Sequence, residues 1–152
     1  MPETKASLLV VDDEPSIRKL LLEILTENGY AARSTTNGFS ALIEICHEVP
    51  DFLISDLSMP DMSGYELLRV VRREFPSIRV VAMSRAFSGD EMPFGVVADA
   101  FFEKGRAFGD LLKLMKSLPP PAQRVQQPIA AASPVWVSRY ERNADGEGFA
   151  TD

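Results

Sequence analysis

Cysteine is nearly absent from this chain of 152 residues, whose single thiol belongs to Cys46. One cysteine excludes an internal disulfide and is typical of proteins from a reducing compartment. The chain also lacks an amino-terminal basic segment followed by a long apolar run, so we expect no signal peptide. Its apolar runs are all shorter than the roughly 18 residues that cross a bilayer. These absences favour a cytoplasmic protein without a membrane span.

Positive charge is also scarce, and it is not clustered. The formal net charge is −6, with 16 lysines and arginines against 22 acidic residues. No basic block offers a surface for nucleic acid, and an acidic chain binds anionic membranes poorly, so we expect neither as a partner. The apolar fraction of 45% is nevertheless enough for a core, and the length fits one domain.

Short apolar runs alternate with helical patterns over residues 1–118. The sequence predicts five strands, at residues 7–11, 30–35, 52–56, 78–83 and 100–103. Most of these strands are near-continuous apolar runs, which is typical of a parallel sheet covered on both faces. With helices between the strands, the pattern predicts an α/β fold with a doubly wound, five-stranded parallel sheet.

Five helices are expected to connect and cover these strands. Three of them are predicted from Pro15 to before Gly29, from Gly38 to before Pro50, and from Gly64 to Phe75. A fourth, within residues 85–97, should be short or irregular, because Gly89, Pro93 and Gly95 interrupt it. The last runs from Phe108 to Leu118.

The composition changes after residue 118. Residues 119–152 contain five prolines and a stretch rich in Gln, Ala and Ser. We expect a tail with a stiff, proline-rich start followed by disorder, so that residues 1–118 form the folded domain. An apolar segment at residues 135–140 (VWVSRY) carries the only tryptophan. It is either a docking motif for a partner or an ordinary part of the tail.

Polar side chains follow four of the predicted strands. Asp12 and Asp13 follow the first strand, Asp56 ends the third, and Ser84 and Lys104 follow the fourth and fifth. The carboxyl ends of parallel strands share one edge of a sheet, where ligands bind. Taken singly, these residues could be helix-capping acids, a turn-forming aspartate and surface side chains. Their joint position favours a common site.

A divalent metal ion is the countercharge that three neighbouring carboxylates favour. Mg²⁺ takes oxygen ligands and is usually held by one or two carboxylates together with a phosphate oxygen. The ligands we expect are Asp13, Asp56 and the backbone carbonyl of Ser58. Asp12 would act through water or by orienting Lys104.

Such a site suits the transfer of a phosphoryl group onto a carboxylate. Asp56 would be the nucleophile, and Lys104 and Mg²⁺ would neutralise the charge that develops. The hydroxyl of Ser84 could then bond a phosphoryl oxygen and draw its loop inward. That movement would act as a ligand-dependent switch.

Residues 6–118 resemble the receiver domain of two-component response regulators. The motifs that carry the resemblance are the pair Asp12-Asp13, the run Asp56-x-x-Met59-Pro60-x-x-x-Gly64, Ser84 and Lys104. The resemblance implies the strand order 2-1-3-4-5 and a flavodoxin-like fold. It also implies Mg²⁺-dependent phosphorylation of Asp56 by a sensor histidine kinase or a phosphotransfer protein, and slow self-dephosphorylation. Output would pass to another protein through the fourth helix, the fifth strand and the fifth helix. Phe101 stands where the family has an aromatic residue that turns inward when the switch closes.

Two positions depart from the pattern of that family. Gly105 follows Lys104 where the family usually has proline, so we expect a looser lysine loop. Arg85 follows Ser84 where the family prefers a small residue, and this cation could cover the site or contact the phosphate. The segment at residues 84–104 also contains Pro93 and Gly95, which disfavour a helix, so the output face could differ from the usual one.

Three functions fit these observations. The first is a phosphorylatable receiver that acts through an unidentified output protein and promotes only its own phosphorylation and dephosphorylation. The second is a binding module of the same fold that no longer depends on phosphorylation, which the departures at Arg85 and Gly105 would allow. The third is an aspartyl-phosphate hydrolase of the haloacid-dehalogenase type. It is disfavoured because Ser58 stands where those enzymes usually carry a second aspartate.

Overall fold

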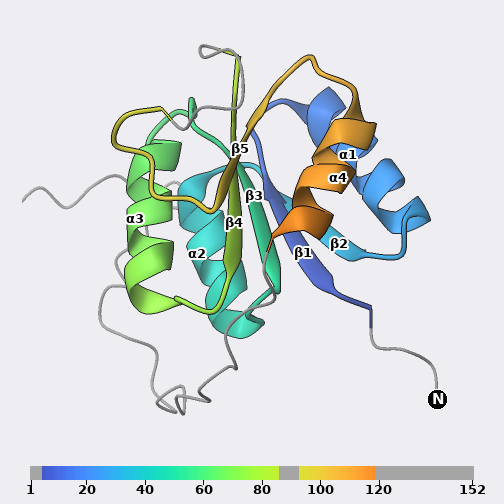
Figure 1. Ribbon diagram of the computed structural model, residues 1–152. Coiled ribbons are helices and arrows are strands. Elements are labelled where there is room, and N and C mark those ends of the chain that lie inside the picture. Colours follow the sequence, from blue (N-terminus) through green and yellow to red (C-terminus); the bar gives the residue numbers. More distant parts are fainter. Residues whose placement is uncertain (1–4, 86–92, 119–152) are drawn as a thin grey trace, which may run out of the picture.

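The protein, described by a computed structural model over residues 5–85 and 93–118, is built on one sheet of five parallel strands (Figure 1). These strands are β1 (Ser7–Val11), β2 (Ala31–Thr35), β3 (Phe52–Asp56), β4 (Arg79–Ser84) and β5 (Ala100–Glu103). They lie in the order β2-β1-β3-β4-β5, and every neighbouring pair is parallel. The predicted α/β class and strand order are therefore confirmed. β2 begins one residue later than predicted, and β4 begins and ends one residue later.

The described part of the chain contains four helices, of which the first three connect strands and the last follows β5. They are α1 (Pro15–Glu27), α2 (Gly38–His47), α3 (Gly64–Glu74) and α4 (Phe108–Ser117). Local sequence explains where the first three begin. Pro15 is the first residue of α1, and the Asn37 side chain accepts a 2.8 Å hydrogen bond from the Ser40 N–H at the start of α2. At the start of α3, Ser63 Oγ accepts a 3.3 Å bond from the Glu66 N–H.

The helix expected within residues 85–97 is not found in the described part of that segment. Residues 93–99 form turns and bends without helix, and Gly95 has a φ of +84°. Pro93 has no backbone N–H to donate, and the left-handed backbone of Gly95 is incompatible with a continuing helix. Residues 86–92 lie outside the described part of the chain. The helix that follows β5 is accordingly labelled α4.

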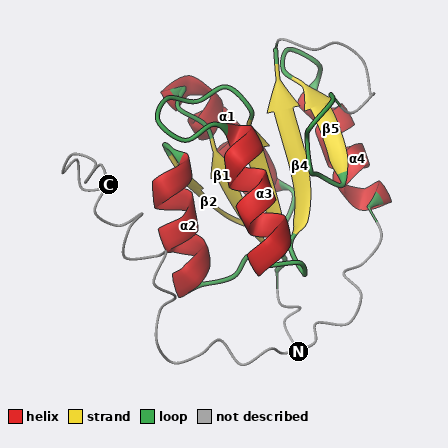
Figure 2. Cartoon of the chain, turned by 90° about the vertical axis from the view of Figure 1, so that its left-hand side faces the viewer, coloured by secondary structure: helices red, strands yellow, loops and turns green. Residues whose placement is uncertain are grey.

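Helices cover both faces of the sheet. α1 and α4 lie on one face, and α2 and α3 lie on the other (Figures 1 and 2). Two apolar clusters result, one on each face. β1 contributes to both clusters, with Leu9 and Val11 in one and Leu8 and Val10 in the other, because alternate side chains of a strand point to opposite faces. This burial on two sides explains why the inner strands β1, β3 and β4 are largely apolar.

The described core reaches the residue at which the composition changes. Leu118, the last described residue of this stretch, is 9% exposed and belongs to the cluster under α1 and α4. The predicted tail, with its segment at residues 135–140, lies outside the described residues and stays a prediction. Within residues 5–85 and 93–118 we find no helix with the length and apolar character of a membrane span.

Candidate functional site

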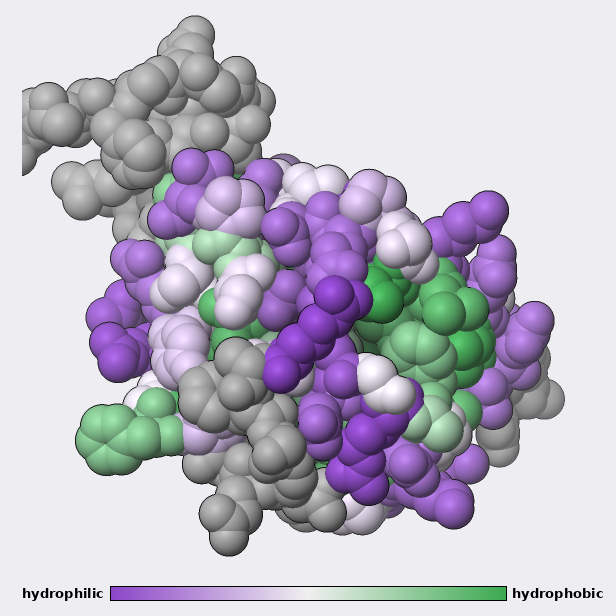
Figure 3. All heavy atoms as spheres, turned by 90° about the horizontal axis from the view of Figure 1, so that it is seen from above, coloured by the Kyte–Doolittle hydropathy of each residue, from purple (hydrophilic) through white to green (hydrophobic). Residues whose placement is uncertain are grey.

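The carboxyl edge of the sheet gathers the polar residues that the sequence places at strand ends. Asp56, the last residue of β3, pairs in register with Met83 of β4, and Ser84 pairs with Glu103 of β5. Asp12 follows β1 directly. Asp12, Asp56 and Ser84 are buried, with 0%, 4% and 1% of their surface exposed. Seen from this edge, hydrophilic residues cover much of the centre of the face (Figure 3).

Lys104 is the centre of an ion-pair network. Its Nζ lies 2.8 Å from Asp12 Oδ2, 2.9 Å from Asp56 Oδ2 and 3.2 Å from Glu14 Oε1. Only 5% of the lysine side chain is exposed, so its charge requires these partners. The Lys104 backbone N–H donates to the Ser84 carbonyl at 3.0 Å, which ties the loop after β5 to the end of β4. The structure thus brings Asp12, Asp56, Ser84 and Lys104 together.

Burial and pairing shift the pKa values of two groups in this network. Desolvation raises the pKa of Asp12 above 3.8, although hydrogen bonds from Lys104 and from the Glu14 backbone oppose it. For Lys104, desolvation lowers the pKa, but hydrogen bonds to Asp12 and Asp56 outweigh it and the pKa lies above 10.5. Lys104 is therefore protonated at neutral pH. The ionised form of Asp12 carries a free-energy cost that a further cation would relieve.

Asp12, Asp13 and Asp56 form a candidate metal site. One carboxylate oxygen from each residue lies within 4.8 Å of the other two. Asp13 is exposed while the other two are buried, so the group is open to water on one side. Oxygen donors with a water-facing side suit Mg²⁺, which keeps several of its waters. The residues present therefore fit this ion, and a contribution from the Ser58 carbonyl stays a prediction.

The loop after β3 holds Asp56 in place. The Ser58 N–H donates to Asp56 Oδ1 at 3.1 Å, and the Leu57 N–H donates to the Met83 carbonyl at 2.9 Å. At the far end of the loop, Gly64 lies against the backbone of Asp56. A Cβ atom on Gly64 would be 2.1 Å from the Asp56 carbonyl oxygen. The glycine of the motif therefore has a packing reason, which is the close approach of two backbone segments.

Ser84 and Phe101 both have buried side chains. Ser84 ends β4 at the same edge as Asp56. Phe101, in β5 beside Ala82, is 2% exposed and belongs to the apolar cluster that includes residues of α2 and α3. In this structure Phe101 is a core aromatic residue. The switching roles of Ser84 and Phe101 stay predictions.

The two departures from the expected pattern have defined conformations. Gly105 has a φ of +101°, which glycine adopts readily and which proline, with φ fixed near −65°, cannot adopt. The lysine loop is nevertheless tied to β4 by the backbone bond of Lys104. Arg85 is exposed, and its Nη2 donates to Glu14 Oε2 at 3.0 Å.

Two residues that contact the site were not among the sequence candidates. Glu14 directly precedes α1, and its carboxylate contacts both Lys104 and Arg85. Arg18 donates from Nη1 to the backbone carbonyl of Asp12 at 2.7 Å. The sequence carries no motif that singles out Arg18.

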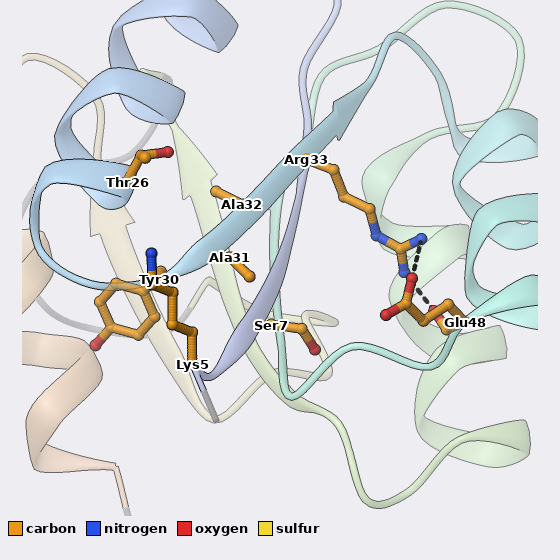
Figure 4. Close-up of a pocket in the computed structure, with 8 residues that line it drawn as sticks. All are labelled: Lys5, Ser7, Thr26, Tyr30, Ala31, Ala32, Arg33 and Glu48. Carbon is orange, nitrogen blue, oxygen red and sulfur yellow. Dashed lines mark hydrogen bonds and ion pairs between the residues drawn. The ribbon is translucent and has the colours of Figure 1, made fainter. Parts of the chain in front are cut away.

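A separate hollow of about 360 Å³ opens at the other end of the sheet. It is lined by residues that include Ser7 and Ala31, which begin β1 and β2. Arg33 reaches across toward Glu48, and Tyr30 lies on the other side (Figure 4). The lining contains none of the site residues at the carboxyl edge, which are Asp12, Asp13, Asp56, Ser84 and Lys104. The carboxyl edge is therefore the candidate functional site.

Comparison with known proteins agrees with this geometry. Residues 8–115 match the family described as the response regulator receiver domain. The response regulator MprA of Mycobacterium avium is 32% identical over 113 residues, which are 73% of this chain and 50% of MprA. The chain therefore spans half of that relative, and it spans less of other curated relatives that it matches.

Solved structures give the same result. TrrA of Thermotoga maritima, in complex with Mg²⁺ and BeF, is 33% identical with a TM-score of 0.68, and the match covers 75% of this chain and 99% of TrrA. A complex of the histidine kinase ThkA with TrrA also matches, with 31% identity and a TM-score of 0.65 over 73% of this chain and 96% of the matched one. Together with the strand order and the family match, these similarities show that the chain belongs to the family of response regulator receiver domains.

Proposed function

We propose that Asp56 accepts a phosphoryl group from a phosphohistidine, carried by a sensor histidine kinase or a phosphotransfer protein. Receiver domains generally act as signalling modules that are phosphorylated on an aspartate. One observation supports the proposal most directly. The buried ammonium of Lys104 lies 2.9 Å from the Asp56 carboxylate, beside a cluster of three carboxylates that fits Mg²⁺. The complex of ThkA with TrrA supports a kinase as the partner.

Asp56 is a better acceptor than its two neighbours. Asp12 is fully buried, and its oxygens are engaged by the Glu14 N–H at 2.9 Å and by Lys104 at 2.8 Å. Asp13 is exposed and has no ion pair with Lys104 among the described contacts. Asp56 alone combines a contact with Lys104, a place at the end of the central strand and a loop that orients its carboxylate.

The chemistry follows from these positions. A carboxylate oxygen of Asp56 attacks phosphorus, the P–N bond breaks, and the imidazole keeps the electron pair. Lys104 neutralises charge that develops on the phosphoryl oxygens, while Asp12 orients the lysine. When bound, Mg²⁺ supplies further neutralisation, and Asp13, Asp56 and the Ser58 carbonyl would hold it, with Asp12 acting through water.

The phosphorylated state would be read by another protein. The Ser84 hydroxyl bonds a phosphoryl oxygen, the end of β4 moves, and Phe101 repacks beneath it. We propose an unidentified output protein rather than nucleic acid or a membrane as the target, in keeping with the net charge of −6. The chain would act in the cytoplasm and would catalyse no reaction beyond its own phosphorylation and dephosphorylation.

Labelling by a small phosphodonor tests the assignment. Incubation with acetyl phosphate and Mg²⁺ should add the mass of one phosphoryl group, and chelation of Mg²⁺ should prevent it. Asp56→Asn should abolish the adduct. Asp61→Asn is the matched control, because Asp61 is an exposed aspartate in the same loop, and it should be labelled normally. Labelling that persists in Asp56→Asn would contradict the proposal, and a chain that is never labelled would instead be a phosphorylation-independent binding module.

A further inference from the structure

Glu14 and Arg85 form an ion pair at the surface of the site. Glu14 is the residue before α1 and Arg85 is the residue after β4, yet Arg85 Nη2 lies 3.0 Å from Glu14 Oε2. The other carboxylate oxygen, Glu14 Oε1, lies 3.2 Å from Lys104 Nζ. One carboxylate is therefore shared by cations from two different loops. The Arg85 and Glu14 side chains are 64% and 35% exposed, whereas Lys104 is buried.

This ion pair links the end of β4 to the loop between β1 and α1. Arg85 directly follows Ser84, so a shift of Ser84 toward Asp56 must carry the backbone of Arg85 with it. Glu14 is held in the loop between β1 and α1, because its N–H donates to Asp12 Oδ1 at 2.9 Å. Movement of the end of β4 therefore changes the position of Arg85 relative to Glu14 and acts on the contact between them.

We propose that the Glu14–Arg85 ion pair is a latch that stabilises the unphosphorylated arrangement of the site and opens when a phosphoryl group occupies Asp56. This inference rests on the proposed function of Asp56. A phosphoryl group brings new negative charge and oxygen acceptors next to Lys104, and it competes with Glu14 for the nearby cations. The latch lowers the apparent affinity of the site for a phosphoryl group, because only molecules with an open latch bind it fully.

The expected effect is small because the ion pair faces water. Exposed pairs change an equilibrium by about two- to fivefold. Removing the latch should therefore tighten binding of a phosphoryl mimic by a factor in that range. Arg85→Ala also removes a positive charge near the site, which should weaken binding of an anionic phosphoryl mimic. The test therefore has to separate the contact between Arg85 and Glu14 from the long-range effect of the charge.

A double-mutant cycle with a phosphoryl mimic makes this separation. Beryllofluoride is titrated with Mg²⁺ into the intact chain, followed by amide NMR, for the wild type, Arg85→Ala, Glu14→Gln and the double variant. In each background, the effect of Arg85→Ala is the ratio of beryllofluoride affinities with and without the substitution. This ratio should be about two- to fivefold larger in the wild-type background than in the Glu14→Gln background. Arg73→Ala is the matched control, because Arg73 and Glu74 form an exposed pair at the same 3.0 Å at the end of α3, and it should leave the affinity unchanged.

The outcomes distinguish the latch from the function on which it rests. If Arg85→Ala has the same effect on affinity in both backgrounds, Arg85 acts only through its charge and the latch is wrong. If the wild type binds no beryllofluoride in the presence of Mg²⁺, the proposed role of Asp56 fails, and the latch fails with it. A larger gain in beryllofluoride affinity from Arg85→Ala in the wild-type background than in the Glu14→Gln background supports both the latch and the proposed role of Asp56.

Discussion

Gly64 leaves no room for a side chain next to Asp56. A Cβ atom there would lie 2.1 Å from the Asp56 carbonyl oxygen and 2.6 Å from Leu57 Cα, and both are backbone atoms that cannot rotate away. We expect Gly64→Ala to lower the free energy of unfolding by about 1–3 kcal/mol, as overpacking does, and to slow labelling of Asp56 because the loop must shift. Urea unfolding and the acetyl phosphate assay measure the two effects.

Gly109 provides the control for this substitution. It also lies in the first turn of a helix, α4, but a Cβ atom there would meet nothing within 4 Å. Gly109→Ala should leave labelling unchanged and should be neutral or stabilising by up to about 1 kcal/mol. Equal losses of stability in the two variants would contradict the packing role of Gly64.

Asp12 makes stability depend on pH. Its pKa is raised above 3.8 in the folded state, chiefly by burial, so folding favours the protonated form. This stabilising contribution is complete below pH 3.8 and is lost as the pH rises through the folded-state pKa. Without Mg²⁺, Asp12→Asn should therefore be more stable than the wild type at neutral pH, and the gain should vanish in acid, where Asp12 is neutral.

Denaturant unfolding across a range of pH, with and without Mg²⁺, measures this dependence. Added Mg²⁺ should stabilise the wild type more than Asp12→Asn, because the ion relieves the crowding of the carboxylates. A variant that is less stable than the wild type at neutral pH without Mg²⁺ would show that the ion pair with Lys104 outweighs the cost of burying the charge.

At the scale of elements, the loop between β5 and α4 depends on the left-handed backbone of Gly105. Its φ of +101° cannot be reached by proline, the residue that the family usually has there. Gly105→Pro should lower the free energy of unfolding by more than about 1 kcal/mol and disturb the loop that carries Lys104. Thermal unfolding and the labelling rate test this. A variant as stable and as active as the wild type would mean that the loop readily adopts the family's conformation.

Strand ends could be predicted well because their chemistry changes abruptly. β3 and β5 have the predicted bounds, since each is a short apolar run that stops at an acidic residue. The same alternation of apolar strands and helices predicts a parallel sheet, and the shared carboxyl edge follows from it. The segment before β5 was harder, because Pro93 and Gly95 argue against a helix without specifying the turn that replaces it.

The predicted site follows from the same strand ends. Asp12, Asp56 and Lys104 come together because the parallel register leaves them little freedom, and the structure places them in one network. The pair of Glu14 with Arg85 joins residues 71 positions apart through two long, partly exposed side chains. Side-chain rotamers and the course of the chain after β4 decide such a contact, and neither leaves a periodic pattern in the sequence.

At the scale of the whole molecule, residues 1–118 should fold and react without the rest of the chain. α4 completes the core, because Leu111 and Met115 are each 1% exposed, and Leu118 belongs to the same cluster. Truncation after Leu118 should therefore leave the unfolding midpoint and the labelling rate unchanged. Truncation after Gly105 removes α4, opens the cluster under α1 and should abolish cooperative unfolding. A large loss of stability in the product that ends at Leu118 would assign a structural role to residues 119–152.

Asp56 is the proposed acceptor of the phosphoryl group, and locating the modified residue tests this assignment directly. After labelling with acetyl phosphate and Mg²⁺, borohydride reduces an aspartyl phosphate to homoserine, which survives proteolysis and can be placed by tandem mass spectrometry. We expect conversion of Asp56 alone, and none when Mg²⁺ is chelated. Conversion of Asp12 or Asp13 instead, or equal conversion of Asp56 without Mg²⁺, would contradict it.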